Sequence, residues 1–185
     1  VHRASGGTAV SAMSWGFVPE WASETRFTRP INARSETAHE KPMFRTAFSK
    51  QRCLVLCDGY YEWQRLSKGR KQPHYFSLPL GAPMILAGLW SSNDRLTGNG
   101  LETFCVLTVS ASSAVNSVHH RMPVILDQEG QSAWLDPARR EEGALRPWLR
   151  PWEGEIEVSP VSTFVNSPAN NSAQCIQTLQ TDSAL

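Results

Sequence analysis

The sequence predicts an α+β fold: a single domain with a curved, mixed or barrel-like β-sheet flanked by short helices. Two observations support this prediction. Five or more segments have the length and the apolar or alternating pattern of strands, whereas few segments repeat apolar residues at helical spacing. The chain has 185 residues, of which 41% are hydrophobic and 19% charged, so it can build one sizeable core.

The expected elements follow one another along the chain without repeats or low-complexity tracts. Ser35 or Thr37 is a candidate helix cap, because Thr37 and Glu40 have the spacing of a capping box. Pro42 suits the first position of a second helix. The predicted helices cover 35–40, 42–50, 130–136 and 141–150. The predicted strands cover 9–19, 52–65 with a bend at Asp58-Gly59, 73–80, 83–90, 102–110, 122–126 and 155–162; a polar, loop-like tail follows from 166.

Charge and cysteine usage exclude several classes of protein. The net charge is +1, so any anion-binding site must be a local cluster. Cys53, Cys57 and Cys105 lie in apolar runs, without C-x-x-C or histidines at metal spacing. This pattern predicts reduced, buried thiols in an intracellular protein without a metal or cofactor. No segment approaches the length of a membrane span, and the first residues do not form a signal peptide.

The segment DGYYEW contains the first candidate for chemistry. On an alternating strand, Tyr61 and Trp63 face one way while Tyr60 and Glu62 face the other. Large neighbours would desolvate Glu62 and raise its pKa toward the range of a general acid. The alternative is a half-exposed edge-strand glutamate paired with Arg65.

Two further segments combine polar groups that suit an anionic ligand. In INARSE, the side-chain amide of Asn32 can donate a hydrogen bond to an oxygen that gains negative charge during a reaction. The guanidinium of Arg34 can bind phosphate or carboxylate through two parallel hydrogen bonds. In HHRMP, His119 and His120 can move protons near neutral pH, and Arg121 can hold an anion beside them. A turn Asn, a surface Arg and structural histidines are the alternatives.

Exposed rings and a basic loop give weaker signals. Trp21 follows Pro19-Glu20 in a loop, where an indole is a possible stacking platform for a base. For Trp15 we expect core packing instead. The basic stretch 65–71 lies between two predicted strands, so we interpret it as a solvated hairpin loop, with phosphate contact as the alternative.

Taken in order and spacing, these segments resemble the SOS response-associated peptidase family, from about Trp15 to Asn171. The HHRMP and DGYYEWQR segments look most like a eukaryotic member of that family. The segments that carry the resemblance are WGFVPEW, INARSET, FRTAF, RCLVLCDGYYEWQ, KQPHYF, AGLW, VLTVSA, HHRMPVIL, WLD and PVSTFVNSPANNS.

The resemblance implies an activity on damaged DNA. Family members bind single-stranded DNA and capture abasic sites through an N-terminal cysteine, exposed when the protein removes its initiator methionine. The α-amine and thiol close a thiazolidine ring with the sugar aldehyde, and lyase activity or crosslink reversal is a further possibility. That cysteine begins a Cys-Gly-Arg motif, which the 185 residues do not contain. We therefore expect residues 1–171 to be an N-terminally truncated family domain, with 172–185 as its polar tail.

The family's site residues carry over onto matching positions. Asn32, Glu62 and His119 correspond to catalytic residues, whereas Arg34, Arg121 and Trp21 are expected to bind DNA; His120 takes a variable position. The expected partner is single-stranded DNA with abasic sites, bound by a monomer with no membrane contact and no cofactor. The expected location is intracellular: nucleus or chromatin in a eukaryote, cytoplasm in a bacterium.

Two alternatives from other classes remain open. One is a non-catalytic single-strand DNA-binding module that lacks the nucleophile. The other is a hydrolase that combines His119 and Glu62 with Cys105 or a nearby serine. Cys105 is a poor nucleophile there, because it lies mid-strand between two apolar residues.

Overall fold

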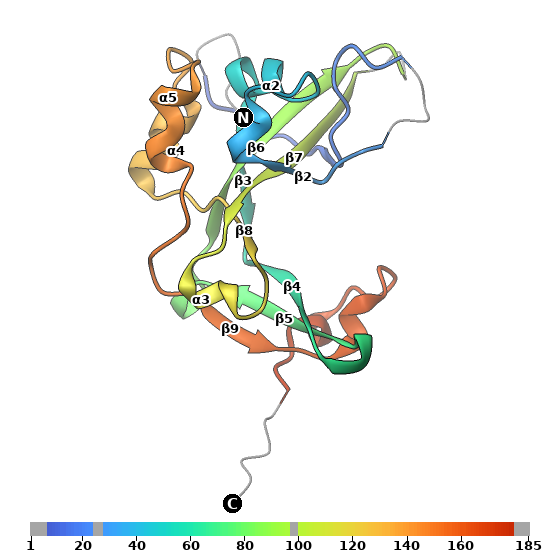
Figure 1. Cartoon of the computed structure of the whole chain (residues 1–185). Coiled ribbons are helices and arrows are strands. Elements are labelled where there is room, and N and C mark those ends of the chain that lie inside the picture. Colours follow the sequence, from blue (N-terminus) through green and yellow to red (C-terminus); the bar gives the residue numbers. More distant parts are fainter. Residues whose placement is uncertain (1–6, 24–27, 97–99, 180–185) are drawn as a thin grey trace, which may run out of the picture. The chain divides into compact units, whose positions relative to one another are not determined.

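The two longest strands form the centre of a six-stranded sheet (Figure 1). They are β6 (Met84–Asn93) and β7 (Leu101–Ser110), which run antiparallel with Gly88 opposite Val106. β3 (Arg52–Cys57) pairs with β6; β1 (Ser14–Trp15) and β2 (Asn32–Arg34) run parallel to β7, and β8 (Arg121–Pro123) also pairs with β7. This computed structural model describes residues 7–23, 28–96 and 100–179. The predicted α+β class, with a mixed sheet and short helices, is confirmed.

The chain divides into two compact units. The first comprises residues 1–56, 85–110 and 122–152, and the second comprises 57–84, 111–121 and 153–185. The break at residue 57 falls where the sequence predicts a bend at Asp58-Gly59. The predicted strand 52–65 is accordingly two strands, which belong to different sheets.

The first unit also holds four short α-helices among its described residues: α1 (Ser35–Ala38), α2 (Arg45–Lys50), α4 (Gln128–Leu135) and α5 (Glu142–Leu145), which the 3₁₀ helix η3 (Arg146–Trp148) extends. The expected capping box is wrong. Pairing of β2 with β7 keeps the chain extended through Arg34, so the helix begins at Ser35 and Thr37 lies inside it. Pro42 does not begin α2 either, because residues 42–44 form a turn before Arg45.

The core of the first unit is built around Trp134 on α4, which is fully buried. Its indole Nε1 donates to the carbonyl oxygens of Cys53, at 3.1 Å, and Gly88, at 3.3 Å. The edge of its ring meets Phe48 of α2, with centroids 5.7 Å apart. A side chain at Gly88 would collide with the Cys53 sulfur, so glycine allows the two strands to pack this closely.

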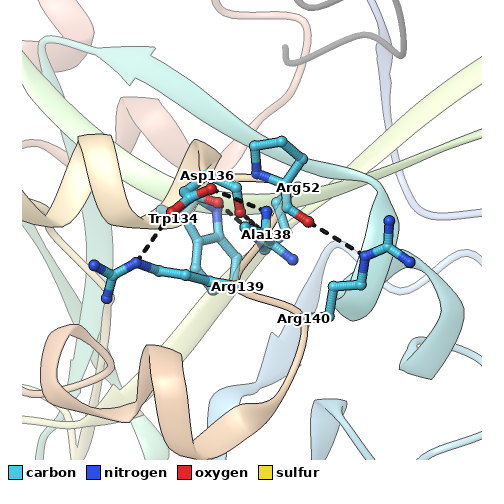
Figure 2. A network of polar contacts seen from close by, with 7 residues as sticks. Arg52, Trp134, Asp136, Ala138, Arg139 and Arg140 are labelled. Carbon is cyan, nitrogen blue, oxygen red and sulfur yellow. Dashed lines mark hydrogen bonds and ion pairs between the residues drawn. The ribbon is translucent and has the colours of Figure 1, made fainter.

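Arg52 anchors both helices to the start of β3. Its side chain is buried, and its guanidinium donates to four backbone carbonyls: Phe48 and Ser49 near the end of α2, at 2.8 and 3.0 Å, and Trp134 and Asp136 at the end of α4, both at 2.6 Å. Figure 2 shows the α4 side of this network. Burial lowers the pKa of Arg52 from its ordinary value. The cation satisfies carbonyls that a helix end leaves without partners.

The second unit is built on a three-stranded antiparallel sheet of β4 (Gly59–Arg65), β5 (Lys71–Ser77) and β9 (Glu157–Pro160). The register places Tyr60 opposite Phe76 and Glu62 opposite His74. The basic stretch joins β4 to β5 through η1 (Ser67–Gly69), as predicted for a hairpin loop, and its Lys68 has a positive φ of 57°. The unit's remaining helical segments are α3 (Ser113–Asn116), η2 (Pro79–Gly81), η4 (Thr163–Asn166) and η5 (Ala173–Ile176).

Two sequence predictions change in detail. The strand predicted at 122–126 is β8 plus a single bridge between Leu86 and Ile125. The tail is not simply a loop up to residue 179: it contains η4 and η5, and Val161 bridges Thr178. Among the described helices, none has the length and apolar character needed to cross a membrane.

Candidate functional site

Glu62 and His119 meet in the second unit. Their side chains are each about one-quarter to one-third exposed, at 27% and 30%, and Glu62 Oε1 lies 3.5 Å from His119 Nδ1. Burial raises the pKa of Glu62 above its ordinary value, although His119 and the backbone N–H of Trp63 act in the opposite direction. The alternative pairing of Glu62 with Arg65 is not what the structure shows. A carboxyl with a raised pKa, next to an imidazole, is suited to acid–base work.

The backbone around His119 fixes its imidazole. The His119 N–H donates to the Val115 carbonyl at the end of α3, at 3.1 Å. His119 Nδ1 lies 3.1 Å from the Arg121 carbonyl oxygen and 3.3 Å from the Arg121 nitrogen. The Gln64 side chain, which follows Glu62 on the same face of β4, donates to the Ser117 carbonyl at 3.0 Å. β4 therefore supplies the carboxyl and also holds the loop that presents the imidazole.

An aromatic stack desolvates the face of β4 that carries Glu62. Tyr60 stacks on Phe76 across the hairpin, with centroids 4.8 Å apart and ring planes within 7° of parallel. The Tyr60 hydroxyl is buried, and no described residue bonds it. Burial, and next the Glu62 carboxylate, raise the pKa of Tyr60, so this phenol stays neutral. The apolar surroundings that the sequence predicted for Glu62 are present.

His74 lies directly opposite Glu62 on β5, and sequence reasoning missed it. Its Nδ1 lies 3.1 Å from the Gln72 carbonyl oxygen, and its other strand neighbour is Pro160 on β9. Directly opposed residues of an antiparallel pair have Cβ atoms about 4.5–5.5 Å apart. No local pattern reveals this neighbour, because it depends on the register between β4 and β5.

Asn32 and Arg34 lie on β2 in the first unit. Their Cα partners on β7 are Val106 and Thr108, and Ala33 between them is buried. Because side chains alternate along a strand, Asn32 and Arg34 share the opposite, exposed face. Asn32 is therefore a strand residue and not a turn residue, and the N-A-R motif presents an amide and a guanidinium together.

The two tryptophans of WGFVPEW are both half-exposed. Trp21 is 51% exposed beside a turn in which the Ala22 N–H donates to the Pro19 carbonyl, as expected for a loop indole. The prediction that Trp15 packs in the core is wrong, because its side chain is 57% exposed. β1 has only two residues, so the ring lies on Phe104 and donates to the Ile31 carbonyl at 2.8 Å without being covered.

The two cysteines on the central strands are poor nucleophiles, whereas Cys57 at the end of β3 is half-buried. Cys105 and Cys53 are buried on the central strands, and burial raises the pKa of Cys53 to about 12. Burial also raises the pKa of Cys105, which argues against the hydrolase alternative. Within the described ranges, no group of three or more His, Cys, Asp or Glu residues is placed to hold a metal ion.

The structure thus brings some predicted residues together within each unit. In the second unit, Glu62 and His119 form a pair, and Arg121 contacts His119 through its backbone. The neighbouring His120 is exposed, and its ring centroid lies 4.5 Å from that of His119. In the first unit, Asn32 and Arg34 share one face of β2.

Comparison with known proteins identifies the family. Residues 1–168 match the model of the SOS response associated peptidase (SRAP) family. The chain belongs to the SRAP family. The abasic site processing protein YoqW of Bacillus subtilis is 36% identical over 167 residues, which cover 89% of this chain and 75% of YoqW.

Other SRAP relatives and a solved structure agree with this assignment. The chicken abasic site processing protein HMCES is 34% identical over 189 residues, covering 89% of this chain and 56% of HMCES. We expected greater similarity to a eukaryotic member, and this expectation is wrong, because the sequence identity with the Bacillus protein is slightly higher than that with HMCES. A crystal structure of a Bacteroides thetaiotaomicron protein superposes with a TM-score of 0.81 at 28% identity, covering 91% of this chain and 76% of that one.

Proposed function

We propose that this chain is the DNA-binding and acid–base part of an abasic site processing protein, which captures ring-opened abasic sites in single-stranded DNA. The observation that carries the proposal is the half-buried pair of Glu62 and His119 on an apolar sheet face. The names of YoqW and HMCES describe the same process in relatives. Together they favour a sugar, and not a peptide of another protein, as the substrate.

Glu62 acts as the general acid that opens the sugar. An abasic deoxyribose is mostly a closed hemiacetal, and only its ring-opened aldehyde is electrophilic. A protonated Glu62 donates to the ring oxygen as the ring bond breaks, and the raised pKa keeps more of the carboxyl protonated at neutral pH. General acid catalysis of this kind is worth about 10²- to 10⁴-fold in rate.

We assign His119 and Asn32 separate roles toward the sugar. His119 exchanges a proton with a sugar hydroxyl, and the same imidazole can promote β-elimination or reversal of the crosslink. Asn32 donates its amide to the opened sugar and holds its geometry. The role of His119 is supported by its contact with Glu62, whereas the role of Asn32 comes from its motif and its exposed position.

Arginines and one indole bind the strand. Arg34 and Arg121 neutralise phosphates that flank the lesion, which fixes the register of the DNA without reading its sequence. The half-exposed Trp21 stacks on a neighbouring base. With a net charge of only +1, the chain depends on such local contacts to bind DNA.

The covalent step needs an amine and a thiol, which the proposal assigns to an N-terminal cysteine that the 185 residues do not include. The amine adds to the aldehyde and water leaves to give an imine, after which the thiol adds to the imine carbon. The product is a thiazolidine, and no oxidant or reductant is consumed. The α-amine titrates near about pH 8, so a useful fraction is neutral at physiological pH. Release of that cysteine by removal of the preceding methionine accounts for the peptidase name.

Denaturing electrophoresis tests the proposal. A version of the protein with Cys-Gly-Arg at its N-terminus is incubated with an oligonucleotide that carries one abasic site. We expect a covalent complex, formed at least tenfold more slowly by Glu62→Gln. Glu157→Gln is the control, since Glu157 lies on β9 of the same sheet and is exposed. Equal capture by wild type and Glu62→Gln would remove the acid assignment. Binding without any capture would favour the non-catalytic module.

A further inference from the structure

The first unit contains a cavity of about 140 Å³ that the proposed chemistry does not use. Its wall includes the Trp21 indole, the Met43 thioether and the Ala47 methyl group. The lining is about half apolar, and its polar members include Ser91 of β6, Arg95 and Glu20. Small-molecule sites typically combine apolar walls with a few convergent polar groups in this way.

The Ser91 hydroxyl is a polar group of a lining residue that has no partner among the described residues. Ser91 is 1% exposed, and no described residue forms a hydrogen bond with its hydroxyl. A buried hydroxyl without a partner is costly, and alanine would fill nearly the same space without that cost. Its neighbour across the ladder, Thr103, instead accepts a hydrogen bond from the Val18 N–H at 2.9 Å. A ligand in the cavity can supply the group that the Ser91 hydroxyl lacks.

The inner volume of the cavity, which is open to solvent on one side, matches a ligand of one ring. An engineered apolar cavity of about 150 Å³ binds benzene, so a cavity of 140 Å³ suits a single six-membered ring. A bicyclic purine needs more room. The half-exposed Trp21 provides an aromatic face, on which any planar base can stack. Arg95 and Glu20 both line the cavity, and the guanidinium of Arg95 is the group that can contact a phosphate attached to the base.

We propose that this cavity binds one unstacked pyrimidine base of the single strand. The inference rests on the proposed function, because it takes single-stranded DNA to be the ligand. The Ser91 hydroxyl bonds a polar atom on the edge of the base, Trp21 stacks on its face, and Arg95 contacts an adjacent phosphate. The protein would therefore prefer pyrimidines near the lesion, whereas phosphate contacts alone give no preference among bases.

The test compares three labelled strands of equal length by fluorescence anisotropy: oligo(dT), oligo(dA) and a strand of tetrahydrofuran spacers without bases. We expect the wild-type chain to bind oligo(dT) most tightly. Ser91→Ala should weaken oligo(dT) binding by about three- to tenfold, the worth of one neutral hydrogen bond, and leave the spacer strand unaffected. Ser92→Ala is the matched control, since successive strand residues face opposite ways.

Three further measurements separate binding from folding. Ser91→Ala removes no hydrogen bond to a described residue, so its Tm should equal or exceed that of the wild type. Ala47→Leu should fill the cavity and abolish the preference for oligo(dT). A strand with 5-iodouracil should crosslink under ultraviolet light to the peptides that contain Trp21 or Met43.

The outcomes distinguish this inference from the proposed function. Equal affinity of the wild-type chain for oligo(dT) and the spacer strand would overturn the pyrimidine pocket and leave abasic-site capture intact. An unchanged preference in both Ser91→Ala and Ala47→Leu would also overturn it. Failure to bind any strand would refute the proposed function and this inference together.

Discussion

Replacing Arg52 by methionine is expected to destabilise the protein by about 4 kcal/mol, because four backbone carbonyls lose their donor and each buried acceptor left unpaired costs about 1–3 kcal/mol. The side chain is only 5% exposed, and its four hydrogen bonds to carbonyls, at 2.6–3.0 Å, tie α2 and α4 to β3. Methionine would occupy much of the same volume. It has no donor for these carbonyls, so the change removes hydrogen bonds without opening a large cavity.

The magnitude follows from the carbonyls left behind. A hydrogen bond to a charged group contributes about 1.5–3 kcal/mol, but burial of the guanidinium, which also lowers the pKa of Arg52, offsets part of the total. Some carbonyls will regain water. The net loss should therefore be smaller than four full hydrogen bonds and larger than one, which agrees with about 4 kcal/mol.

Urea unfolding, followed by tryptophan fluorescence and circular dichroism, measures this loss. Arg139→Met is the control: Arg139 pairs with Asp136 at 3.2 Å in the same network (Figure 2), but its side chain is 42% exposed. An exposed pair contributes about 1 kcal/mol or less. A loss below about 1 kcal/mol in Arg52→Met, or equal losses in the two variants, would refute the view that Arg52 caps both helices.

Three other predictions follow from the second unit and the thiols. Because the pKa of Glu62 is raised in the folded state, the free energy of unfolding of the wild type should fall relative to that of Glu62→Gln as the pH rises from about 4 through the folded pKa. Urea unfolding at several pH values should therefore show a difference in unfolding free energy between the two proteins that is small at low pH and then grows. Gly59→Ala should cost about 2–3 kcal/mol, since its new methyl group would overlap the Phe76 carbonyl; in Gly143→Ala, where the space is open, thermal unfolding should show no loss. Iodoacetamide followed by mass spectrometry should label Cys57, the half-buried thiol, before the three buried cysteines; earlier labelling of a buried one would contradict the core packing.

Local sequence was a good guide to the elements of each sheet. The alternation of 59–65 correctly placed Tyr60 and Glu62 on one face of β4, and the Asp58-Gly59 pair correctly marked the bend. The capping box at Thr37 failed because pairing with β7 keeps residues 32–34 extended, and this outweighs a weak local capping signal. The prediction for Trp15 also failed because of tertiary structure: β1 has only two residues, so few neighbours cover the indole ring.

By itself, the sequence determined the α+β class, the position of most strands, the apolar setting of the thiols and the family of the chain. Each of these depends on residue type and on spacing within a few positions. Only the tertiary structure decided that His119 lies 3.5 Å from Glu62, that His74 stands opposite it, and that Arg52 bonds carbonyls as far as 84 residues away. Such contacts join segments remote along the chain, and strand register and close packing of the whole unit select them.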